Sequence, residues 1–140
     1  MADELVLIVD DNAKNAKLAR DLLGAAGFRT LEAGSGREAT ALAREHRPDV
    51  ILMDIRLPDM DGTEAAHQLK ADARTAEIPI VALTSLTTSP SWFREAGFDG
   101  YLEKPISVRE FAHQVRGYCN RNRERIEEND QMTKFWPWNV

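Results

Sequence analysis

Three short apolar runs constrain the fold of this chain most strongly, because each is too short for a buried helix and rich in β-branched residues. They are "LVLIV" (residues 5–9), "DVILM" (49–53) and "IPIVAL" (78–83). Segments with helical periodicity lie between them, so strands and helices alternate along the chain. This alternation predicts βα units, whose crossovers produce a mainly parallel sheet with helices on both faces.

Helix starts and weaker strands complete the pattern. Ser35-x-x-Glu38 and Ser107-x-x-Glu110 match the capping box that opens many helices, and Asp61-x-x-Glu64 is similar. Weaker strands are predicted near 29–33 and 99–102. The first helix is expected to bury one face, made of Ala16, Leu18, Ala19, Leu22, Leu23 and Ala26. The last is expected to bury Val108, Phe111, Ala112, Val115 and Cys119.

Size and charge exclude several classes of protein. A chain of 140 residues with 43% hydrophobic content supports one core. Its net charge of −5, with no basic stripe, argues against nucleic-acid and anionic-membrane surfaces. No run approaches the roughly 18 apolar residues of a membrane span, and the N-terminus has no signal-peptide pattern. With a single cysteine, Cys119, we expect a cytoplasmic protein.

Charged and hydroxyl side chains follow the predicted strands. Asp10 and Asp11 end the first strand, Asp54 the third and Thr84 the fourth, and Lys104 follows the fifth. In an open α/β sheet the carboxyl ends of the strands form the ligand crevice, so these side chains are expected to meet there.

Three carboxylates in one crevice require a cation. Each pair about 4 Å apart costs about 4 kcal/mol at an effective dielectric of about 20. A hard divalent ion with oxygen ligands answers this need, and Mg²⁺ suits the site better than zinc because no histidine or cysteine stands near.

The segments "LIVDDN", "ILMDIRLPDMDG", "VALTS" and "YLEKP", in this order, resemble the receiver domains of two-component response regulators. The match spans about residues 4–119, and it divides the chain into a receiver domain, 1–122, and a C-terminal helix extension with an aromatic tail, 123–140. The chain is similar to the stand-alone chemotaxis and cell-cycle types. The resemblance implies a flavodoxin-like (βα)5 three-layer sandwich with parallel strand order 2-1-3-4-5.

The resemblance also assigns an acceptor and a metal site. Asp54 is the implied phosphoacceptor, forming an aspartyl phosphate. Asp11, Asp54 and the backbone carbonyl of Arg56 are the implied direct ligands of Mg²⁺, with Asp10 acting through a water and Mn²⁺ as an alternative ion. The Arg56 side chain is either solvated or screens the phosphate.

A second group of residues is implied in holding and reporting the phosphoryl group. Lys104 and Thr84 would each contact a phosphoryl oxygen, and Thr84 would draw inward and leave space for Tyr101 to rotate. Tyr101 is otherwise explained as a core aromatic. The Lys104–Pro105 peptide bond is cis in the family.

These roles together predict a phosphorylation-dependent switch. The phosphoryl group would come from the phosphohistidine of a sensor histidine kinase or a histidine phosphotransfer protein, and the output would be contact with a downstream protein. We expect no enzyme in the turnover sense, only intrinsic Mg²⁺-dependent phosphotransfer to itself and autodephosphorylation. The sequence leaves a homodimer open.

Three rival functions were weighed. The main alternative is a phosphorylation-independent interaction module that acts through the fourth-helix face and the tail. A phosphatase or phosphomutase would carry a second acid two residues after Asp54, where this chain has Arg56. A flavin or nucleotide binder would need a glycine-rich or hydroxyl-rich loop after the first strand, and "VDDNAKNAKL" is acidic instead.

The chain departs from the receiver pattern at the fourth helix, which is predicted to be short. Ser89 is the expected N-cap and Pro90 the first helical residue, with the helix running to Ala96 and stopping at Gly97.

Five aromatic side chains are candidate partner contacts. Trp92 and Phe93 are expected to be partly exposed on the short helix. The tail, which either folds back on the domain or docks on a partner, adds Phe135, Trp136 and Trp138.

Overall fold

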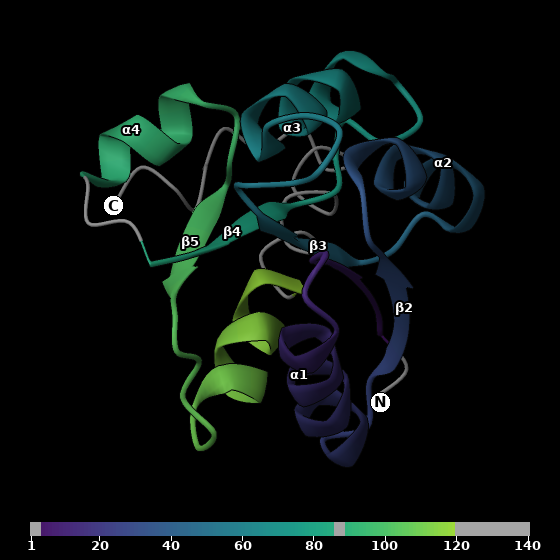
Figure 1. Ribbon diagram of the computed structural model, residues 1–140. Coiled ribbons are helices and arrows are strands. Elements are labelled where there is room, and N and C mark those ends of the chain that lie inside the picture. Colours follow the sequence, from purple (N-terminus) through teal and green to yellow (C-terminus); the bar gives the residue numbers. More distant parts are fainter. Residues whose placement is uncertain (1–3, 86–88, 120–140) are drawn as a thin grey trace, which may run out of the picture.

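The computed structural model describes residues 4–85 and 89–119, and a five-stranded parallel sheet runs through their centre (Figure 1). Its order is β2-β1-β3-β4-β5, as predicted. The strands are β1 (Leu5–Val9), β2 (Arg29–Ala33), β3 (Val50–Asp54), β4 (Ile80–Thr84) and β5 (Gly100–Glu103). The three apolar runs therefore form the three central strands, β1, β3 and β4, which are covered on both faces.

Two strands lie slightly further along the chain than the sequence predicted. β3 begins at Val50 because the Asp49 carboxylate instead accepts a hydrogen bond from the Leu5 amide, at 2.7 Å. β4 begins at Ile80, after Pro79, which has no amide hydrogen to donate to the ladder. The shift makes Asp54 the last residue of β3, paired with Leu83 of β4.

Helices cover both faces of the sheet. On one face lie α2 (Gly36–His46), α3 (Gly62–Ala71) and α4 (Pro90–Glu95), and on the other lie α1 (Ala13–Ala25) and the helix of residues 111–119 (Figure 1). Two buried apolar clusters match these layers, one containing Phe93 and Leu69 and the other Phe111 and Leu23. The three-layer sandwich is confirmed.

Two of the three predicted capping boxes supply side-chain caps. The Ser35 hydroxyl accepts from the Glu38 amide at 3.1 Å, and that of Ser107 accepts from the Glu110 amide at 3.2 Å. Asp61 is the N-cap residue of α3, but its side chain makes no capping hydrogen bond.

The predicted buried face of α1 was wrong at one residue. Ala16, Ala19 and Leu23 are buried, whereas Leu18 is 42% exposed. At 3.6 residues per turn, Leu18 lies about 200° around the helix from Ala16, so it cannot share that face.

The fourth helix is short, as predicted. The Ser89 hydroxyl caps it by accepting from the Trp92 amide at 3.3 Å, and Pro90 is its first residue. It ends at Glu95, one residue earlier than expected, and Gly97 follows with φ of 103°, the left-handed conformation that ends many helices.

The expected exposure of the α4 aromatics was half wrong. Trp92 is 38% exposed, but Phe93 is 1% exposed and belongs to the core. The Phe93 ring stacks on Tyr101 with centroids 4.5 Å apart and planes 12° apart. In so short a helix, this one inward aromatic anchors α4 to β5, so Phe93 is no surface contact.

Two predictions fall outside the described residues: the domain boundary after residue 122, and the tail contacts Phe135, Trp136 and Trp138. Within residues 4–85 and 89–119, no helix has the length and apolar content that a membrane span requires.

The two α4 aromatics should differ sharply in their effect on stability. Phe93→Ala is expected to lower the free energy of unfolding by about 3–5 kcal/mol, because it leaves a cavity in the core. Trp92→Ala, the matched control on the next residue, should cost about 1 kcal/mol or less because its side chain is partly solvated. Urea unfolding measures both, and equal losses would contradict the packing described here.

Candidate functional site

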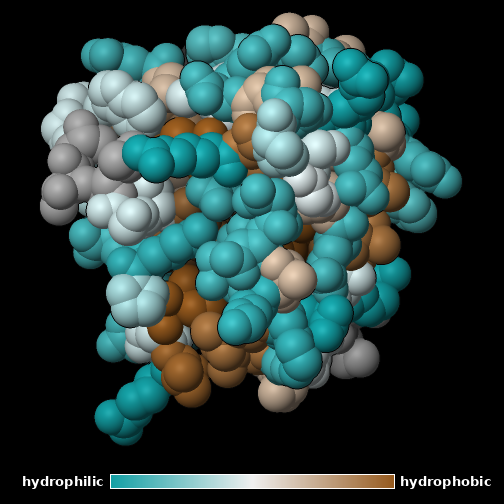
Figure 2. Space-filling model, viewed as in Figure 1, coloured by the Kyte–Doolittle hydropathy of each residue, from teal (hydrophilic) through white to brown (hydrophobic). Residues whose placement is uncertain are grey.

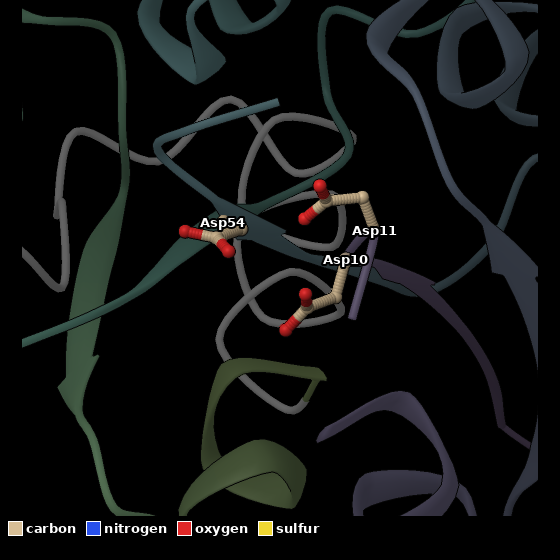
Figure 3. A group of neighbouring side chains, drawn as sticks. All are labelled: Asp10, Asp11 and Asp54. Carbon is tan, nitrogen blue, oxygen red and sulfur yellow. The ribbon is translucent and has the colours of Figure 1, made fainter. Parts of the chain in front are cut away.

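Three carboxylates meet at the carboxyl edge of the sheet. Asp10 and Asp11 follow β1, and Asp54 ends β3; Figure 3 shows their side chains reaching one space from these two positions. One carboxylate oxygen from each lies within 4.8 Å of the others. Asp10 is buried, Asp54 is half-buried and Asp11 is exposed, so the cluster opens to solvent on one side.

Lys104 is the cation of this cluster. Its Nζ lies 3.2 Å from Asp54 Oδ2 and 3.4 Å from Asp10 Oδ2. Its backbone amide donates to the carbonyl of Thr84 at 2.8 Å, which ties the residue to the end of β4. Three carboxylates and one ammonium leave a formal charge of −2, so the site retains the charge of a divalent cation to be neutralised.

The Asp10 side chain is held by its own loop. Asp10 Oδ1 accepts from the Asn12 amide at 2.9 Å, and the Asp10 amide donates to the Ala33 carbonyl at 3.0 Å. Asn12 in turn caps α1, accepting from the amides of Lys14 and Asn15. The acidic turn is thus fixed between β2 and the start of α1.

Asp54 lies beside the loop of residues 55–61. Its Oδ1 accepts from the Arg56 amide at 3.3 Å, and the Arg56 side chain is exposed. The loop closes at its base, where the Gly62 amide donates to the Ile55 carbonyl at 2.6 Å. Residue 62 must be glycine, because a Cβ there would lie 2.5 Å from the carbonyl oxygen of Asp54.

Thr84 and Lys104 lie on the other side of Asp54. With Ile55, Arg56 and Ser85 they line a hollow of about 230 Å³ next to the carboxylate. Thr84 is the last residue of β4 and is buried. A small tetrahedral anion beside Asp54 would therefore meet a hydroxyl and an ammonium in the same hollow.

Tyr101 lies on β5, paired with Ala82 of β4 and stacked on Phe93. Its side chain is half-buried. The Lys104–Pro105 peptide bond is cis.

Comparison with known proteins identifies the family. Residues 6–116 match the model of the response regulator receiver domain. The chain belongs to this family. It is also 44% identical, over 115 residues, to the polar-differentiation response regulators DivK of Brucella anthropi and Brucella ovis, and these matches cover 81% of this chain and 94% of the relatives.

Solved structures of receivers share the fold. A response regulator from Chloroflexus aurantiacus superposes with a TM-score of 0.79 at 29% identity, covering 84% of this chain and 98% of that one. The receiver domain of a Pseudomonas aeruginosa sensor histidine kinase gives a TM-score of 0.77 at 30% identity with the same coverage. That structure carries a magnesium ion coordinated in its active-site cleft.

The structure thus brings together the predicted site residues Asp10, Asp11, Asp54 and Lys104, with Thr84 beside Asp54. Two further residues were given no role from the sequence. Gly62 allows the close return of the loop, and its place in the motif "LPDMDG" was the available signal. Asp59, in the same motif, bonds to the start of α2, and no local pattern indicates that contact.

Removing one charge from the receiver's acidic cluster should stabilise the metal-free protein. Asp11→Asn is expected to raise the free energy of unfolding by about 1–2 kcal/mol in EDTA, because a close carboxylate pair costs about 1 kcal/mol in water and more in the protein. Added Mg²⁺ should stabilise the wild type more than the variant. Denaturant unfolding with and without Mg²⁺ gives both values.

Asp21→Asn is the matched control, since Asp21 is exposed and paired with Lys17 at 2.7 Å instead of crowded by other acids. It should give no gain in EDTA. A metal-free Asp11→Asn protein less stable than the wild type would contradict the repulsion argument.

Proposed function

We propose that this receiver is a phosphorylation-dependent signalling switch that accepts a phosphoryl group on Asp54. The observation that carries the proposal is the position of that carboxylate. It ends a buried strand, lies 3.2 Å from the Lys104 ammonium, and borders a hollow that also contains Thr84. A rigid strand end holds the nucleophile still while its head faces solvent, and positioning is a large part of phosphoryl-transfer catalysis.

The acidic cluster fits a resident Mg²⁺ ion by the chemistry of its donors. Asp11, Asp54 and the Arg56 carbonyl would bind it directly and Asp10 through a water, and Mn²⁺ would substitute. All are oxygen ligands, which hard cations prefer. When bound, the ion neutralises the carboxylates and the charge that gathers on the phosphoryl oxygens.

In the transfer itself, one carboxylate oxygen of Asp54 attacks phosphorus. A P–O bond forms while the P–N bond to the donor histidine breaks, and the bonding electron pair leaves with the imidazole nitrogen. Lys104, already beside Asp54, would pair with a phosphoryl oxygen, and the Thr84 hydroxyl would donate to another. Catalysis is confined to this step and to hydrolysis of the aspartyl phosphate, so the receiver is a signalling protein.

The output would follow from Thr84 and Tyr101. If the Thr84 hydroxyl turns toward a phosphoryl group, Tyr101 can move into the vacated space. That movement breaks the stack on Phe93, a contact of the kind worth about 0.5–1.5 kcal/mol, so the two states lie close in energy. Tyr101 and Phe93 line a hollow of about 370 Å³ with Pro90, Phe98 and Tyr118, and a downstream protein would sense its change of shape.

An apolar surface next to the site fits the phosphohistidine donor. Leu18 is 42% and Val108 67% exposed, and Leu18 borders a small cleft with Pro105, Ile106 and Lys104. Figure 2 shows apolar surface at the lower left, where α1 and the segment after β5 lie side by side. Because the cleft also contains Asp10, a protein docked here places its histidine at the acidic cluster. Such donors place the receiver in the cytoplasm.

Labelling tests the acceptor. Incubated with ³²P-labelled acetyl phosphate and Mg²⁺, the wild type should incorporate acid-labile phosphate, and Asp54→Asn should incorporate none, because an amide oxygen is a poor nucleophile. Asp21→Asn, an exposed acid on α1, is the control and should label normally. Label retained by the folded Asp54→Asn protein would reassign the acceptor. A wild type that never labels would favour the phosphorylation-independent interaction module.

A kinase assay tests the docking surface. Leu18→Ala should slow transfer from a phosphorylated histidine kinase of the same organism about fivefold or more, because truncating an interface leucine costs about 1 kcal/mol or more. Labelling by acetyl phosphate should not change, since that donor needs no protein contact. Trp92→Ala, on the opposite face of the sheet, should leave both rates unchanged. If Leu18→Ala slowed both donors equally, the effect would lie in the site and not in docking.

A further inference from the structure

The loop of residues 55–61 has a firm base and an anchored tip. At the base the Gly62 amide bonds to the Ile55 carbonyl, and Arg56 pairs with Asp61 in an isolated β-bridge. The Arg56 carbonyl, proposed above as a metal ligand, stands on this loop. Its position therefore depends on what holds the rest of the loop.

The tip of the loop is bonded to the start of α2 by Asp59. Oδ1 accepts from the Gly36 amide at 2.8 Å and Oδ2 from the Arg37 amide at 2.9 Å. These amides, Arg37 first and then Gly36, hold the pKa of Asp59 below its ordinary value. Next to it, Met60 fills the space beside Gly36, where a Cβ would lie 2.5 Å from the Met60 Cγ.

The same turn between β2 and α2 also holds the other half of the site. The Ala33 carbonyl, three residues before Gly36, accepts from the Asp10 amide at 3.0 Å. The acidic turn after β1 and the loop after β3 are thus both bonded to residues 33–37. This turn links the two sets of proposed metal ligands.

We propose that Asp59 is a positioning residue for the divalent cation, and that it sets the place of the Arg56 carbonyl relative to Asp10 and Asp11 through the β2–α2 turn. The inference rests on the proposed function, since Arg56 is a ligand only if the acidic cluster binds Mg²⁺. Mg²⁺ demands near-ideal octahedral geometry, so releasing the loop that carries one ligand weakens binding. Outer partners of metal ligands typically contribute about 10- to 100-fold in affinity.

Capping of α2 is a separate contribution. The Ser35 hydroxyl bonds to the Glu38 amide at 3.1 Å, and Glu38 Oε1 accepts from the Gly34 amide at 2.9 Å. Neither bond touches the loop after β3. Ser35→Ala therefore destabilises the same helix end while leaving the anchor intact, which makes it the matched control.

Isothermal titration calorimetry with MgCl₂ on the full chain tests the proposal. Asp59→Ala should weaken Mg²⁺ binding about 10-fold, the low end of such effects. Ser35→Ala should lose stability in urea unfolding to a similar degree, by about 1 kcal/mol, yet bind Mg²⁺ within twofold of the wild type. Asp59→Asn keeps one acceptor oxygen for the two amides, so its affinity should lie between those of the wild type and Asp59→Ala.

The variants separate the anchor from its rivals. Equal losses in Asp59→Asn and Asp59→Ala would mean that only the negative charge matters, and equal losses in Ser35→Ala and Asp59→Ala would mean that only helix stability matters. Either result overturns the proposal, as does unchanged affinity in Asp59→Ala. A wild type that binds no Mg²⁺ would instead overturn the proposed function of the acidic cluster.

Discussion

The structure depends on a repulsion that the fold tolerates. Parallel β1 and β3 bring three carboxylates within 4.8 Å of one another, with the single ammonium of Lys104 beside them. The core beneath supports this cost, because the apolar residues of β1 and β3 are almost wholly buried. An unneutralised cluster at the edge of a stable sheet is ready for a cation, and through it for an anionic phosphoryl group.

The sheet and its loops divide the work of positioning. Strand ends place Asp54 and Thr84, while the turns after β1 and β3 orient Asp10 and the Arg56 carbonyl. Both turns are bonded to the β2–α2 turn, so an element without any proposed ligand ties them together. On the far side of the site, α4 is short and fastened by one aromatic stack, Phe93 on Tyr101. The acidic side is therefore rigid and the output side is held by few contacts.

Local patterns predicted the strands, their order through the resemblance, the Ser35 and Ser89 caps, and the residues of the acidic cluster. These features depend on neighbours within about four positions, or on the rule that parallel strands end at one edge. The errors concerned which side of a helix faces the core. Leu18 was placed inward and Phe93 outward, and both were wrong. Apolarity alone does not decide burial when a helix is short or its apolar residues surround more than one face.

The sequence by itself determined the alternation of strands and helices and the acids, hydroxyl and lysine at the strand ends, because those signals are carried by residue type and spacing. Only the tertiary structure decided that Asp59 bonds to α2, 23 positions back from it at Gly36. Only the packing of α1 beside the segment after β5 leaves Leu18 at the rim of the acidic site. The physical reason is that such contacts join segments whose separation in space is set by the packed core and leaves no mark on the local sequence.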